Sequence, residues 1–316
     1  MTSTPLHAAV DFATDSQIKN FYAICSMTVL YYDYLLTLPA EVELFWKRKE
    51  FSWFATLFYL NRYSALFAHI PVFMEYLWSS FRDVEDRSVV CLHTHRYHGY
   101  YAVIAQVIIG AMLIIRTHAL YGHKRRVLVL LLVVTTIGFS LGCWALASSE
   151  PASITQIEYW PKTGCIEPLT DTGGKHIAIA WGGLALFDVT VYALTVSKAI
   201  RSRKLGPRTR SLVEVILRDA SMYIAIMLAS QVVNVLTSAI APTALKGIST
   251  TYSTVMASVM VSRLSLNLRD PSLLSPTSTI NGPNSALQFA GGTFIENARS
   301  SDQTDSTSSQ ERNGTL

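Results

Sequence analysis

The sequence predicts an all-α polytopic membrane protein, built as a bundle of seven transmembrane helices. Half of its 316 residues are hydrophobic and 15% are charged, a composition too apolar for a soluble core to hide. Seven apolar stretches alternate with polar loops. Each stretch has about 20 residues, which lets an α-helix cross about 30 Å of hydrocarbon. None shows the period of two that the wall of a β-barrel requires.

Each predicted span covers one apolar stretch. The spans are Phe21–Ala40, Trp53–Trp78, Tyr100–Tyr121, Val127–Leu146, His176–Val196, Ala220–Ile240 and Gly247–Leu266. The last is the least apolar, because Ser and Thr residues crowd its first turns. Such hydroxyls can bond back to carbonyls of their own helix, so a helix bundle tolerates them.

Lys and Arg residues concentrate on every second loop. Clusters at 47–49, 124–126 and 198–218 follow the first, third and fifth spans, and that side holds roughly twice as many basic residues as the other. Because cytoplasmic loops retain positive charge, the N-terminus is predicted outside and the C-terminus in the cytosol. The plasma membrane is favoured over internal membranes.

The chain divides into three predicted parts. Residues 1–20 form a short extracellular or lumenal segment, residues 21–266 form the seven-helix domain, and residues 267–316 form a cytosolic tail. The tail is rich in Ser and Thr and contains no sustained apolar run, which predicts disorder.

Two of the four cysteines, Cys91 and Cys165, fall in the longer outer loops of this topology. Since the outer compartment is oxidising, these two are the predicted disulfide pair. Two free thiols are the alternative, and the shared compartment favours the bridge.

Several motifs place charged residues beside particular neighbours. The first is the segment Tyr31–Tyr63, which includes Asp33, Glu41, Trp46 and Asn61-Arg62-Tyr63. The others are RTHALYG at 116–122, Arg218-Asp219, and SRLSLNLR at 262–269. In these motifs the chain resembles the domain of unknown function 6533 family, fungal multi-pass integral membrane proteins. The resemblance implies the multi-pass architecture and carries no activity to any residue.

Ionisable groups within the spans are the first candidates for a functional role, because each costs several kcal/mol in hydrocarbon unless it is paired. These residues are Asp33, Arg62, Glu75, Arg116 and Asp188. Their depths along the helices predict one pair between Asp33 and Arg62 and a second between Arg116 and Asp188. A structural role, in which the pairs hold the helices of the bundle together, is favoured, and a role in switching or transport is the alternative.

Other motifs argue against catalysis and metal binding. Residues 138–142 (GFSLG) match the GxSxG of serine hydrolases, but they lie inside a span and also form a helix-packing GxxxG, which is favoured. Cys91, His93, His95 and His98 fit no zinc pattern, so a solvated loop is favoured there. With no convergent catalytic set and no phosphate loop, the sequence predicts neither an enzyme nor a cofactor or nucleic-acid partner.

The loop after the fifth span carries the strongest basic cluster. Its members are Lys198, Arg201, Arg203, Lys204, Arg208 and Arg210. One interpretation is attraction to anionic lipid of the inner leaflet. The other is a docking surface for a cytosolic signalling partner, and the sequence leaves both open.

The functional prediction is a receptor-like sensor that couples a small-molecule ligand outside to a cytosolic partner. The outside N-terminus, the outer cysteine pair, the basic inner loop and the Ser/Thr-rich tail favour it by topological analogy. A small-solute transporter or channel is the alternative, in which Asp33, Arg62 and Asp188 would line a polar path. No repeat between halves supports that alternative.

Overall fold

The structure is a computed structural model that describes residues 5–47, 52–78, 87–148, 171–203, 210–242 and 245–269. All of them belong to one compact unit, Met1–Leu274. The second unit, Ser275–Leu316, corresponds to most of the predicted tail and lies outside the described residues.

The described chain is helical throughout, which confirms the predicted all-α class. Its seven α-helices and one π-helix are α1 (Pro5–Glu41), η1 (Val42–Trp46, the π-helix), α2 (Trp53–Trp78), α3 (Arg87–Leu120), α4 (Arg125–Ser148), α6 (Asp171–Arg203), α7 (Arg210–Ile240) and α8 (Ser249–Asn267). Three helices begin well before the predicted spans, α1 at Pro5, α3 at Arg87 and α7 at Arg210. The predicted solvated loop around Cys91 is therefore part of α3.

Five of these helices are long and apolar enough to cross a membrane. Their apolar segments are Gln17–Trp46, Arg96–Leu120, Arg125–Ala145, Asp171–Arg201 and Leu217–Ile240. The predicted spans in α1, α3, α4, α6 and α7 are thus confirmed as membrane-compatible, whereas α2 and α8 are not among these five. Arg62 and Asn61 lie within α2, and the first turns of α8 are rich in Ser and Thr.

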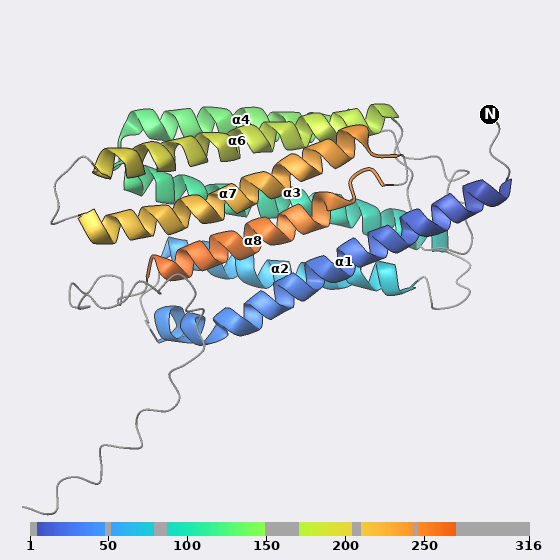
Figure 1. Cartoon of the computed structure of the whole chain (residues 1–316), viewed down its shortest axis with the longest axis horizontal. Coiled ribbons are helices and arrows are strands. Elements are labelled where there is room, and N and C mark those ends of the chain that lie inside the picture. Colours follow the sequence, from blue (N-terminus) through green and yellow to red (C-terminus); the bar gives the residue numbers. More distant parts are fainter. Residues whose placement is uncertain are drawn as a thin grey trace, which may run out of the picture. The chain divides into compact units, whose positions relative to one another are not determined.

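The helices form a closed ring in chain order. Each contacts the next along the chain, and α8 returns to contact α1; α3 also contacts α6 and α8, and α8 contacts α2. Successive helices alternate in direction (Figure 1). We call one end the basic end, where α1, α3, α6 and α8 finish and α2, α4 and α7 begin. Its described basic residues include Lys47, Lys124, Arg125, Arg126, Lys198, Arg201 and Arg269. We call the other the opposite end.

Helix α8 is enclosed by its neighbours. Most of its side chains are buried, including hydroxyls such as Thr251 and Ser258. Four helices, α1, α2, α3 and α7, contact it. A helix that is shielded from lipid has no need of an apolar outer face. This position explains why α8 is the least apolar of the predicted spans.

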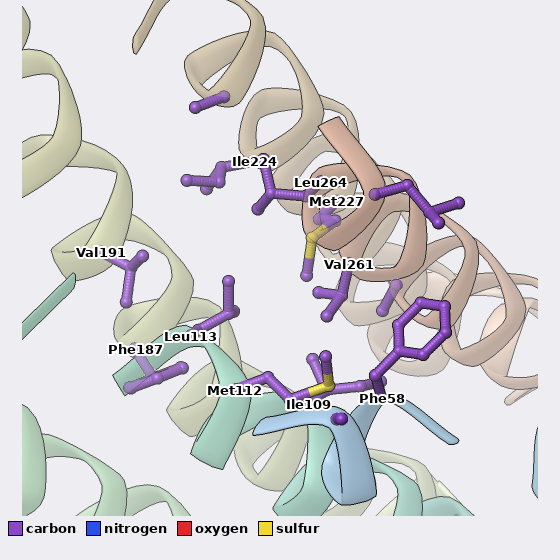
Figure 2. Packing of buried hydrophobic residues seen from close by; sticks show 14 of the residues in the cluster. Phe58, Ile109, Met112, Leu113, Phe187, Val191, Ile224, Met227, Val261 and Leu264 are labelled. Atoms are coloured by element: carbon purple, nitrogen blue, oxygen red, sulfur yellow. The ribbon is translucent and has the colours of Figure 1, made fainter. Parts of the chain in front are cut away.

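The largest apolar cluster draws buried residues from η1, α2, α3, α4, α6, α7 and α8. Figure 2 shows its members converging from α2, α3, α6, α7 and α8; those labelled are Phe58, Ile109, Met112, Leu113, Phe187, Val191, Ile224, Met227, Val261 and Leu264. Large apolar side chains also face outward, among them Phe21, Leu35, Val133, Leu186, Leu236 and Ile240. Such extensive outward apolar surface suits contact with lipid rather than water.

Helices α4 and α6 approach closely at two glycines. A Cβ atom added to Gly183 would lie 3.1 Å from the Cα of Gly138 and 3.1 Å from a methyl carbon of Leu141. The predicted packing role is therefore confirmed for Gly138. Its companion Gly142 has nothing within 4 Å of an added Cβ, so the close contact pairs one glycine from each helix.

We expect Gly183→Ala to lower the melting temperature and Gly142→Ala to raise it. Alanine favours a helix interior by about 0.5–1 kcal/mol over glycine, and only Gly142 has room for the methyl group. At Gly183 the backbones of α4 and α6 must separate, and overpacking typically costs about 1–3 kcal/mol. Thermal unfolding of the two purified variants checks this, and equal shifts would contradict the close approach.

Candidate functional site

The guanidinium of Arg62 ties α2 to the end of α1. Arg62 is 4% exposed, and its Nε lies 2.6 Å from Oε2 of Glu41. Its Nη2 donates to the carbonyl oxygen of Tyr34 at 3.1 Å and to Oγ1 of Thr37 at 2.6 Å. The same group lies 4.8 Å from the centre of the Tyr34 ring. A buried charge with this many partners is a strong constraint on the two helices.

Glu41 is the acceptor at the centre of this arrangement and is fully buried. Its Oε1 accepts from Nε1 of Trp46 at 3.1 Å and from the hydroxyl of Tyr63 at 3.0 Å. Glu41 ends α1, and the π-helix η1 follows it directly. The wider turn of η1 brings Trp46, five residues later, onto the carboxylate. Single turns of π-helix occur often at functional sites.

A second ion pair joins α1 to α8. The carboxylate of Asp33 pairs with Nε of Arg263, and both side chains are largely buried. One helix away, Nδ2 of Asn61 donates to the carbonyl oxygen of Ser258 at 3.1 Å and to Oγ of Ser262 at 3.0 Å, which links α2 to α8. At the end of α8, the Arg269 guanidinium lies 4.0 Å from the ring centre of Phe45 in η1.

These contacts form one network, which we call the signature network. Its members are Asp33, Tyr34, Thr37, Glu41, Trp46, Asn61, Arg62, Tyr63 and Arg263. It joins α1, η1, α2 and α8 toward the basic end. Because the partners come from three helices, any relative movement of α8 must stretch or exchange a charged contact.

The predicted partners of the intramembrane charges are wrong. Asp33 pairs with Arg263 rather than Arg62, and Arg62 pairs with Glu41. The flexible stem of Arg62 reaches toward the basic end, where Glu41 lies about 12 Å along α1 from Asp33. Glu41 follows the predicted end of the first span and Arg263 lies near the end of the last, and neither was among the predicted intramembrane charges.

The second predicted pair does not form. Among the residues that the structure describes, neither Arg116 nor Asp188 makes an ion pair, although Asp188 is only 6% exposed. Glu75 lies in α2, with its side chain outside the described part. Whether these residues act in function stays a prediction.

The RTHALYG motif shapes the end of α3. The hydroxyl of Tyr121 donates to the carbonyl oxygen of Leu194 in α6 at 2.8 Å. Gly122 and His123 follow with φ of 63° and 59°, left-handed conformations that favour glycine and end a helix. The motif therefore closes α3 and fastens it to α6.

The predicted basic loop is described only at its edges. Lys198, Arg201 and Arg203 lie in the last turns of α6, and Arg210 begins α7. Lys204 and Arg208 lie outside the described residues. The described basic side chains stand at the same end as the signature network.

At the opposite end, sequence reasoning missed a further ion pair. Nζ of Lys246, just before α8, pairs with the carboxylate of Asp171 at the start of α6. The lysine side chain is buried, whereas the aspartate is exposed. Nearby, Thr251 of α8 hydrogen-bonds to Nε2 of His98 in α3 at 3.1 Å. No group of three metal-ligating side chains occurs within the described ranges.

Residues 21–67 match the family model described as a family of unknown function, DUF6533. The predicted resemblance is confirmed over that segment. Every member of the signature network except Arg263 falls inside it. The DUF6533 segment therefore corresponds to one physical unit, the α1–η1–α2 side of the network. No curated protein and no solved structure matches the chain.

The predicted disulfide stays untested, because the side chain of Cys91 and all of Cys165 lie outside the described part. We expect a Cys91–Cys165 bridge, which would tie α3 to the segment before α6. Non-reducing electrophoresis should show faster migration of the wild-type protein than of Cys165→Ser, and reducing agent should abolish the difference. Identical migration without reducing agent would contradict the bridge.

Proposed function

We propose that the chain crosses the plasma membrane seven times, with its N-terminus outside, and acts as a receptor-like sensor. Five apolar helices support the membrane location. The enclosed position of α8 supports counting it as a span despite its hydroxyls. The basic residues at one end support a cytosolic position for that end.

The observation that carries the proposal is an asymmetry along α8. Toward the opposite end, buried polar side chains of α7 and of the start of α8 lack hydrogen-bond partners among the described residues. Toward the basic end, the same helix enters the signature network through Arg263. The apolar cluster of Figure 2 packs along the same helix from Ala257 to Leu266, beside the network. A sensor needs two distinct sites that bias one shared element, and α8 touches both regions.

The proposed mechanism is a shift of α8. A ligand that binds between α7 and α8 would favour one position of α8 over another, by the difference in its affinity for the two. That shift would pull Arg263 relative to Asp33 and change the contacts of α1 and α2. A cytosolic partner reading the basic end would then bind one arrangement better.

A transporter is the second candidate, and Asp188 favours it. This carboxylate lies midway along α6, is buried, and has no ion-pair partner among the described residues. Intramembrane acids of this kind often serve in proton or ion pathways. Ligand-driven flux that is lost in Asp188→Asn would support this second function.

A ligand screen on the purified full chain tests the two functions. A molecule that binds only the folded state should stabilise it by about 2.7 kcal/mol when its free concentration is about 100 times its Kd. For each molecule that binds, amide hydrogen exchange over residues 262–269 measures the response of α8. Transport of the molecule into liposomes that contain the protein measures flux. The sensor predicts altered exchange over residues 262–269 and recruitment of a cytosolic partner without flux. Flux without altered exchange would contradict the sensor.

A further inference from the structure

The face of α7 changes from apolar to polar along its length. Ile224 and Met227 are buried in the apolar cluster. One turn further on, Gln231, Asn234 and Ser238 continue the same face, because steps of three and seven residues nearly complete whole helical turns. All three are buried, at 1%, 0% and 0% exposure.

The polar stretch of α7 contacts the start of α8 through Asn234. Oγ1 of Thr250 donates to Oδ1 of Asn234 at 3.2 Å, which fixes the two helices side by side at this level. Ser249, the neighbour of Thr250, is also fully buried. We call Gln231, Asn234, Ser238, Ser249 and Thr250 the polar seam.

The polar seam holds more hydrogen-bonding capacity than the described protein uses. Within the described residues, neither polar atom of the Gln231 amide has a partner, and neither does Nδ2 of Asn234. The hydroxyls of Ser238 and Ser249 lack partners as well. Buried polar groups are nearly always satisfied in folded proteins, so a group of five unpaired atoms points to a missing hydrogen-bond partner.

The seam is bounded at both ends. Met227 and the apolar cluster lie toward the basic end. Toward the other end stands the Lys246–Asp171 pair, and a Cβ added to Gly174 would meet Cδ of Lys246 at 2.7 Å and the carbonyl oxygen of Ser238 at 2.9 Å. The lysine stem therefore lies against α6 beside the outermost seam residue, where it caps the seam.

The chemistry of the seam selects the kind of molecule. Its unpaired atoms include amide and hydroxyl donors and a carbonyl acceptor. Its members are all uncharged, and Lys246, which lies beside Ser238, is already paired with Asp171. An ionic ligand would lack a counter-charge there, whereas a neutral molecule with donors and acceptors would complete the bonds.

We infer that the polar seam binds a small uncharged molecule that both donates and accepts hydrogen bonds, such as a primary amide or a polyol. This inference rests on the proposed function, since it gives the chemical class and position of the outer ligand. Entry requires the Lys246–Asp171 cap to open. Bound between α7 and α8, the molecule would set the position of α8.

The test measures thermal unfolding of the purified full chain with propionamide and with glycerol as probes. The seam variants are Gln231→Met and Asn234→Leu, which keep side-chain volume and remove the amide. The matched control is Thr237→Val on α7, whose hydroxyl donates only to backbone carbonyl oxygens of its own helix among the described residues, those of Val233 and Asn234. General solvent effects of the probes should be equal in all four proteins.

We expect a saturable rise in melting temperature for the wild type and the control with at least one probe. The apparent Kd should increase about tenfold or more in both seam variants. An equal Kd in the seam variants would overturn the inference. So would the absence of any saturable shift in the wild type.

Hydrogen exchange over residues 262–269 separates this inference from the proposed function. Seam-dependent probe binding that leaves this exchange unchanged would uphold the seam and contradict the sensor. A ligand that alters the exchange equally in wild type and Gln231→Met would uphold the sensor and overturn the seam as its site.

Discussion

Replacing Arg62 with methionine is expected to lower the free energy of unfolding by about 3–5 kcal/mol, because it leaves the carboxylate of Glu41 buried without its counter-charge. Glu41 is fully buried, and the 2.6 Å contact with Nε of Arg62 is its ion pair. The substitution also removes the bonds to Tyr34 and Thr37. Thermal or denaturant unfolding of the purified protein measures the loss.

Two further variants make this result specific. Arg218→Met is the control, because the Arg218 side chain is 72% exposed, and exposed substitutions usually change stability by less than about 0.5 kcal/mol. In Arg62→Met/Glu41→Gln, the amide carbonyl can still accept from Trp46 and Tyr63, so most of the loss should be recovered. A double variant as unstable as Arg62→Met would contradict the pairing of Arg62 with Glu41.

The second large effect on the free energy of unfolding is expected at Asp33, whose ion-pair partner in the structure is Arg263. A double-mutant cycle with Asp33→Asn and Arg263→Gln should give a coupling energy of about 1–3 kcal/mol, as charged groups in one buried network do. Each single variant removes one charge of the pair in a low-dielectric setting. Unfolding of the four proteins of the cycle measures the coupling.

A parallel cycle with Asp33→Asn and Arg62→Met is the control for partner choice. Arg62 contacts Glu41 rather than Asp33, so its coupling to Asp33 should be smaller by about 1 kcal/mol or more. Stronger coupling of Asp33 to Arg62 than to Arg263 would restore the pair expected from the sequence and contradict the signature network.

The helices could be predicted from the sequence wherever the chain is apolar enough to lie in the hydrocarbon core of a membrane. Each predicted span coincides with one observed helix, because long apolar stretches have few other solutions in a membrane. The starts of α1 and α3 could not be predicted in this way. Pro5 and Arg87 begin helices whose first turns are polar, so hydropathy does not mark them.

The sequence predicts some members of the signature network but not the contacts between them. Asp33, Arg62 and the motifs around them were identified because charge is costly in a membrane. Their partners depend on the reach of long side chains and on which helices touch, and neither is encoded in spacing along one helix. Glu41 and Arg263 lie close to the ends of predicted spans. Charged residues are common there, so their charge does not mark them as functional candidates. The polar seam was missed because its amides and hydroxyls are uncharged, so they are not among the ionisable groups that mark candidate sites within a membrane.

Sequence and structure together explain the DUF6533 segment in physical terms. The part of the chain that matches the family model holds the acid, the arginine and the aromatic groups that fasten α1 to α2. The SRLSLNLR motif supplies the matching residue on α8, Arg263. Motifs far apart in the chain thus meet in one network.

The central claim is that seven helices cross the membrane and place the signature network toward the cytosol. Epitope tags at the N-terminus, between His123 and Lys124, and at the C-terminus test it by labelling intact and permeabilised cells. The account predicts that intact cells expose the N-terminal tag and that the other two become accessible only after permeabilisation. If α2 and α8 both failed to cross, the tag at 123–124 would be exposed on intact cells; if only one failed, the C-terminal tag would be. Either result would contradict the account.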